Sequence, residues 1–147
     1  MSGCPTLADN PVGLKDNVGV ALTDSAGTTA VGESLMLLDS GAHVTSTMDA
    51  FAALTSGCAS FTGTIDAGGA SYTVDFTTTA GSFASIGDRT VAVELNANLE
   101  GFTFTTDIVF VQYKDTIIAV TNEGDPTDSS LTATAVDAAY HKAAARW

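Results

Sequence analysis

The feature that most constrains this sequence is a two-residue alternation of apolar and polar side chains that recurs between Phe61 and Val120. Successive side chains of a β-strand point to opposite faces, so this alternation indicates strands with one buried and one exposed face. The strands it predicts lie at about residues 59–65, 71–77, 89–97, 102–113 and 116–121. Short turns join them as antiparallel hairpins, with Gly68 and Gly69 in one turn and Lys114 and Asp115 in another.

One of these strands should lie in the middle of the sheet. Residues 102–113 form the longest apolar stretch of the chain, and residues 108–111 at its centre are Ile, Val, Phe and Val. An unbroken apolar run of this kind indicates a strand that is buried on both faces.

The N-terminal part of the chain is less regular. Residues 1–17 read as an irregular lead-in that Cys4 ties down, and residues 18–23 as a strand followed by a loop at 24–29. The apolar run within residues 33–39 predicts a further strand, covered on both faces.

Two helices are expected. Ser46 followed by Asp49 has the spacing of a capping box, and Gly57 can close the helix, so that Cys58 follows its end. The second helix should span residues 126–146, opened by Asp125 and Pro126.

The charges of the C-terminal helix match its dipole. Acidic residues lie at its start, and His141, Lys142 and Arg146 lie at its end. Together these elements predict one α+β domain over residues 1–147, a curved antiparallel sheet of about six to seven strands with two helices packed on it.

Cys4 and Cys58 are the two cysteines of the chain, which leaves one possible intramolecular disulfide. A bridge would suit an oxidising compartment, and we then expect Met1 to replace a signal peptide on a secreted or extracytoplasmic domain. In the alternatives, the protein is cytosolic, or Cys4 carries a lipid anchor and Cys58 is free.

The charge of the chain limits its partners. Its 17 acidic and 5 basic side chains give a net charge of −12, which repels nucleic acids and anionic lipid headgroups. No apolar run approaches the roughly 20 residues of a membrane-spanning helix.

Few residues offer catalytic chemistry. A nucleophilic triad would need His43 or His141 as its base, and we interpret both as surface residues near helix ends. Two carboxylate couples, Asp66 with Asp75 and Glu94 with Glu100, have the residue types of a glycosidase, but a single Trp argues against a sugar-binding cleft.

Metal and cofactor sites are not expected. The histidines and cysteines show no ligand spacing, and no glycine-rich phosphate loop is present. Glu123, Asp125 and Asp128 are candidates for weak Ca²⁺ binding, but they lack the spacing of calcium loops, so helix capping is the preferred interpretation.

Four segments, in this order, resemble the PknH-type extracytoplasmic sensor domains of actinobacterial proteins, which also occur in small lipoproteins. They are residues 49–64 (DAFAALTSGCASFTGT), 86–93 (IGDRTVAV), 108–120 (IVFVQYKDTIIAV) and the alanine-rich helix at 131–146. The resemblance implies a sensing or binding module and carries over no catalytic residue.

The chain also departs from that pattern. Members usually have a longer N-terminal segment, the kinase-attached form has two disulfides, and a tryptophan typically precedes the cysteine where Ser56 and Gly57 stand here.

The function expected from these observations is a non-enzymatic, exported sensor-like domain. It would bind a small ligand or an envelope protein in a cleft framed by the sheet and the loop at Gly87 and Asp88. The alternative is a structural protein of a virion or surface layer, built from self-associating β domains, since its long strands carry few charged edge residues.

Overall fold

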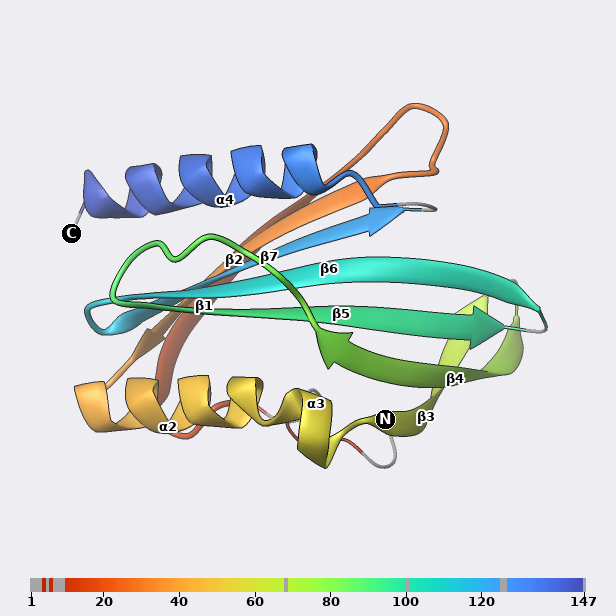
Figure 1. Cartoon of the computed structure of the whole chain (residues 1–147), viewed down its shortest axis with the longest axis horizontal. Coiled ribbons are helices and arrows are strands. Elements are labelled where there is room, and N and C mark those ends of the chain that lie inside the picture. Colours follow the sequence, from red (N-terminus) through yellow and green to blue (C-terminus); the bar gives the residue numbers. More distant parts are fainter. Residues whose placement is uncertain are drawn as a thin grey trace.

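The computed structural model describes residues 4, 6, 10–67, 69–99, 101–124 and 127–146. These residues form one open antiparallel sheet with helices on both faces (Figure 1). The strands are β1 (Leu14–Thr23), β2 (Ala30–Leu38), β3 (Ser60–Ala67), β4 (Ala70–Ala80), β5 (Arg89–Leu99), β6 (Phe102–Tyr113) and β7 (Thr116–Gly124). Across the sheet their order is β1-β2-β7-β6-β5-β4-β3, so the expected α+β class with an antiparallel sheet of seven strands is confirmed.

The hairpins follow the predicted turns. In β6 and β7, Tyr113 pairs with Thr116 on either side of the turn at Lys114 and Asp115. The β5–β6 hairpin pairs without a bulge along the whole length of β5. The centre of β6, residues 108–111, is buried throughout, as predicted.

Helices cover the two faces of the sheet separately. α2 (Gly41–Ala52) and the short α3 (Leu54–Gly57) lie on one face, and α4 (Ser129–Ala144) lies on the other (Figure 1). Within the described part of the chain, no helix is long and apolar enough to cross a membrane.

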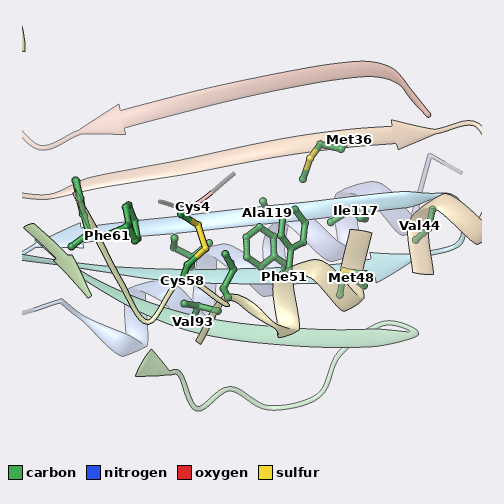
Figure 2. Close-up of a cluster of buried hydrophobic side chains, with 14 of the residues drawn as sticks. Cys4, Met36, Val44, Met48, Phe51, Cys58, Phe61, Val93, Ile117 and Ala119 are labelled. Atoms are coloured by element: carbon green, nitrogen blue, oxygen red, sulfur yellow. A yellow bond between two sulfur atoms is a disulfide. The ribbon is translucent and has the colours of Figure 1, made fainter. Parts of the chain in front are cut away.

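Each face has its own apolar cluster. Beneath α2, the ring of Phe51 stacks on Phe110 of β6 with 3.8 Å between centroids, and Met48 and Ile117 are fully buried beside them (Figure 2). On the other face, small and β-branched side chains of α4 pack on β6 and β7, which lets the helix lie close to the sheet. The buried members of that cluster are Val109, Val111, Ile118, Val120, Val136, Ala139 and Ala143.

A disulfide joins Cys4 to Cys58, the C-cap residue of α3, with 5.3 Å between the two Cα atoms. Both cysteines are buried in the α2-side cluster near Phe51 and Val93 (Figure 2). The bridge links two positions 54 residues apart in sequence.

The start of the first helix differs from the prediction. α2 begins after Ser40, whose hydroxyl accepts a hydrogen bond from the backbone N–H of His43, and Ser46 lies inside the helix and donates to the carbonyl of His43. The capping box predicted at Ser46 and Asp49 was therefore wrong. A serine hydroxyl inside a helix can donate a hydrogen bond to a backbone carbonyl of the preceding turn. The sequence around a serine does not distinguish this role from capping.

Other boundaries differ as well. β1 begins at Leu14, within the expected lead-in of residues 1–17, because β2 extends to Leu38 and supplies a partner for it. α4 spans Ser129–Ala144 rather than 126–146, because Asp128 caps it. Asp125 and Pro126, the predicted opening of this helix, lie outside the described residues, as does Gly68.

The strand predicted at residues 33–39 is also less covered than expected. It begins at Ala30, and in β2 only Met36 and Leu38 are buried. The remaining residues of β2 are half-buried, because β2 lies next to the edge strand β1, whose own residues are almost all exposed.

Candidate functional site

A groove of 580 Å³ opens on the α4 face of the sheet. Its walls are the end of β4 and the loop after it (residues 80–84), residues 92–94 of β5, residues 107–109 of β6, and the start of α4. We call it the α4 groove. Pockets that hold small ligands fall between roughly 300 and 1,000 Å³, so its size suits a small molecule.

Hydrogen bonds to β5 hold the loop wall in place. The backbone N–H of Gly81 donates to the carbonyl of Ala92 at 3.0 Å. Further along, the hydroxyl of Thr90 donates to the carbonyl of Ile86 at 2.6 Å and accepts from its N–H at 2.9 Å. Phe83, which lines the groove, and Ile86 also pack against the apolar cluster under α4.

Gly87 and Asp88 anchor the other end of this loop to β6. Gly87 has φ +69°, and a Cβ there would lie 2.5 Å from the carbonyl oxygen of Gln112. Asp88 donates its N–H to the same carbonyl, and its carboxylate accepts from the N–H of Lys114 at 2.9 Å. These two residues, which were expected to frame a cleft, do not line the groove; residues 80–84 form its wall instead.

Two carboxylates face each other across the floor. Glu94 of β5 and Asp107 of β6 are directly opposed in the hairpin, and both are half-buried. Like charges at opposed positions destabilise a sheet. No described residue that lines the groove is Lys, Arg or His, so the two charges have no cationic partner within it.

Neutral side chains donate to these carboxylates instead. The amide of Asn96 donates to Glu94 Oε1 at 2.9 Å, and the hydroxyl of Thr132 in α4 donates to Asp107 Oδ2 at 3.1 Å. A hydrogen bond from Thr105 to Asn96 Oδ1 extends the network along β6. The groove thus keeps a negative floor supported by neutral donors.

A buried amide lies beside this floor. Asn122 of β7 pairs in register with Asp107 and is fully buried. Its Nδ2 donates to Thr132 Oγ1 and to the carbonyl of Asp128, each at 2.9 Å, whereas its Oδ1 has no hydrogen-bond partner among the described residues.

Asp128 acts as the cap of α4. Its carboxylate accepts hydrogen bonds from the Ser130 hydroxyl and from the backbone N–H groups of Leu131 and Ser130, and these bonds lower the pKa of Asp128, the Ser130 hydroxyl most. Of the three residues considered for Ca²⁺, Glu123 is exposed on β7 and Asp125 lies outside the described residues. Among the residues that the structure describes, no three His, Cys, Asp or Glu side chains form a metal-binding group.

The predicted glycosidase couples are not brought together. Asp66 pairs with Ser71 and Asp75 with Thr62, which places the two aspartates four residue pairs apart on β3 and β4, roughly 13 Å at strand spacing. Glu100, the expected partner of Glu94, lies outside the described residues.

The structure instead opposes Glu94 and Asp107, a pair that the sequence interpretation missed. The signal that could have found it is the short connection between the two strands, because the pairing of Leu99 with Phe102 fixes the register of the β5–β6 hairpin.

The histidines lie near helix ends, as expected. The ring of His43, in the first turn of α2, contacts the carboxylate of Asp39, which lowers the pKa of that carboxyl mainly through their hydrogen bond. His141 is in the last turn of α4, 3.4 Å from Asp137. In the described part of the chain no Ser or Thr hydroxyl bonds to either ring, and both cysteines are in the disulfide.

These features define an α+β domain with an open antiparallel sheet and a groove beneath its C-terminal helix. The fold is similar to that of the crystal structure of the extracellular domain of PknH from Mycobacterium tuberculosis, with a TM-score of 0.59 and 15% sequence identity. The match covers 92% of this chain and 66% of that domain, so the chain is shorter than the domain it resembles. No protein-family profile matches the sequence, and no curated protein matches it.

Proposed function

We propose that this chain is a non-enzymatic, sensor-like domain that acts outside the cytoplasm and binds a small ligand in the α4 groove. The observation that carries the proposal is the groove itself: a ligand-sized space whose floor holds two opposed carboxylates and whose described lining residues include no cationic side chain. The likeness of its fold to the extracellular domain of a kinase supports a sensing role.

The chemistry of the groove indicates what the ligand presents. Glu94 and Asp107 are acceptors when ionised, and a donor or cation between them would relieve their repulsion. Phe83 and the alanines of the walls supply apolar surface. A small organic cation with an apolar portion therefore fits better than an anion, and the size of the groove favours a small molecule over an envelope protein.

Binding is proposed rather than nucleophilic catalysis because the described thiols and imidazoles, the candidates for a nucleophile and its base, are engaged elsewhere. Both thiols are bonded to each other, and His43 and His141 each lie against an aspartate away from the groove lining.

The disulfide supports the proposed location. A buried bridge persists in oxidising compartments and is rare in the cytosol. It also uses the sulfur of Cys4, so the alternative of a lipid thioether at Cys4 is incompatible with this structure.

The test is an NMR titration of the labelled protein with spermidine and arginine as cationic probes, and with glutamate and glucose as anionic and neutral controls. We expect the cations to shift the amide signals of Glu94, Asp107 and Thr132. Replacing both carboxylates (Glu94→Gln with Asp107→Asn) should weaken binding about tenfold or more, since hydrogen bonds to charged groups contribute about 1.5–3 kcal/mol each.

The control variant is Asp137→Asn, which removes one negative charge from the exposed side of α4 outside the groove. It should leave binding nearly unchanged. The site assignment fails if no probe shifts these signals, or if the control weakens binding as much as the groove variant.

The alternative function, a structural protein built from self-associating β domains, requires an open strand edge. One specific observation favours it, the exposed apolar side chains of the edge strand β1. Pairing through that edge is compatible with ligand binding in the groove.

A further inference from the structure

The floor of the α4 groove belongs to a polar row that crosses the three central strands of the sheet. Glu94 of β5 lies opposite Asp107 of β6, and Asp107 lies opposite Asn122 of β7. Directly paired residues of an antiparallel sheet share a face, so all three side chains are on the α4 side. Thr132 of α4 bonds to both Asp107 and Asn122. We call Glu94, Asp107 and Asn122 the acceptor row.

The acceptor row has more acceptor oxygens than the described residues supply donors. Both hydrogen bonds to the Glu94 carboxylate reach Oε1, from Asn96 at 2.9 Å and from Thr79 at 3.5 Å, and the bond to Asp107 reaches Oδ2. Glu94 Oε2 and Asp107 Oδ1 are left without a described donor. The same holds for Oδ1 of Asn122, whose side chain is fully buried.

This imbalance indicates a ligand that donates hydrogen bonds as well as carrying positive charge. The start of α4 would otherwise be the place for an anion, because the free N–H groups of a helix N-terminus bind negative groups. Here the Asp128 carboxylate already accepts from the N–H groups of Ser130 and Leu131. The helix end therefore adds a negative charge near the groove rather than a site for an anion.

The spacing of the two carboxylates suits a single nitrogen atom. Directly opposed residues of a sheet have Cβ atoms about 4.5–5.5 Å apart, so one ammonium group between Glu94 and Asp107 can donate to both. This requires at least two N–H groups on that nitrogen. A quaternary ammonium has none, and sites for such cations surround them with aromatic rings. Phe83 is the one aromatic side chain among the described residues that line the groove.

We propose that the ligand of the α4 groove is a primary or secondary amine. Its ammonium group donates one hydrogen bond to Glu94 and one to Asp107, and its hydrocarbon part lies against Phe83 and the alanines of the walls. This inference rests on the proposed function and adds to it the property by which the groove selects among cations, the number of N–H donors.

The test is a titration of the full chain with phenethylamine and its N-methyl, N,N-dimethyl and N,N,N-trimethyl derivatives, followed by the NMR signals of Glu94, Asp107 and Thr132. All four carry one positive charge at neutral pH, as alkylammonium groups do, and they offer three, two, one and no N–H donors. The first methyl group should leave the dissociation constant nearly unchanged, because two donors remain. The second and the third should each raise it about tenfold, since each removes a hydrogen bond to a charged group.

Single variants test whether the two carboxylates cause this selection. Glu94→Gln and Asp107→Asn each leave one charged acceptor, so each should weaken phenethylamine binding and reduce the loss caused by the second methyl group. Both also remove like-charge repulsion from the sheet, so we expect both to fold. Asp137→Asn removes a carboxylate from the exposed side of α4 outside the groove and should change neither quantity.

The methylation series also distinguishes failure of this proposal from failure of the proposed function. If all four cations bind equally, or if the trimethyl cation binds best, the groove binds cations without regard to N–H donors and the amine proposal is wrong. A loss that is already complete at the first methyl group would contradict it too, because it would indicate steric exclusion by the walls. Absence of any shift with phenethylamine would overturn the amine proposal, and absence with spermidine and arginine as well would overturn the proposed function.

Discussion

At the scale of single residues, Gly87 determines where the loop wall of the α4 groove is attached. Its left-handed backbone favours glycine, and a Cβ there would collide with Gln112 and Val111 of β6. Gly27, in the turn between β1 and β2, has a similar φ of +71°, but a Cβ there would meet nothing within 4 Å. Comparing alanine substitutions at Gly87 and Gly27 therefore distinguishes the conformational cost of a side chain from its steric cost.

We predict that Gly87→Ala destabilises the protein by about 3 kcal/mol, the sum of a left-handed alanine and overpacking against Gln112 and Val111. Gly27→Ala should cost only about 1 kcal/mol of stability, because it carries the conformational cost of a left-handed alanine and no steric overlap. Urea unfolding of both variants measures the difference. Equal losses would show that the anchor at Gly87 is not tightly packed.

At the scale of elements, the start of a helix depends on which of several nearby side-chain hydroxyls accepts a hydrogen bond from the first free backbone N–H groups. Ser40 and Ser46 lie six residues apart, and each offers a hydroxyl near the start of an amphipathic segment. The structure uses Ser40 as the cap, because β2 ends at Leu38 and the chain must turn there to reach the face of the sheet.

The helix boundary can be tested by replacing each serine. Ser40→Ala removes the acceptor for the N–H of His43 and should cost about 1 kcal/mol. Ser46→Ala, inside α2, should change stability by less than about 0.5 kcal/mol, since alanine favours the helix. Denaturant midpoints compare the two, and a larger loss at Ser46 would restore the boundary expected from the sequence.

At the scale of the whole molecule, the Cys4–Cys58 disulfide attaches the N-terminal segment to the core beneath α2. The closed loop contains β1, β2, α2 and α3, so the bridge constrains two of the seven strands, at one edge of the sheet, and the helices that follow them. Its contribution is mainly to the unfolded state, which loses freedom when the loop is closed.

We predict that reduction lowers the free energy of unfolding by about 4 kcal/mol, the chain-entropy value for a loop of this length. Urea unfolding with and without reductant measures the loss, and the intact mass before reduction should show two hydrogens fewer than the free dithiol. Two freely labelled thiols in protein that was never reduced would contradict the bridge and, with it, the proposed extracytoplasmic location.

The sequence by itself determined the strands and the class of fold. The alternation in β4 and β5, the apolar centre of β6 and the turn at Lys114 are local signals, since neighbouring residues along the chain decide which side chain is buried and where the chain reverses.

Tertiary structure decided the rest. β2 lies beside β7, and the α4 groove combines β5 and β6 with a helix that comes after β7 in the chain, because packing of the two apolar faces selects those neighbours. The opposition of Glu94 and Asp107 depends on both. The register of the β5–β6 hairpin, a local feature, places them opposite each other, but they form the floor of a groove only because α4 packs on β6 and β7.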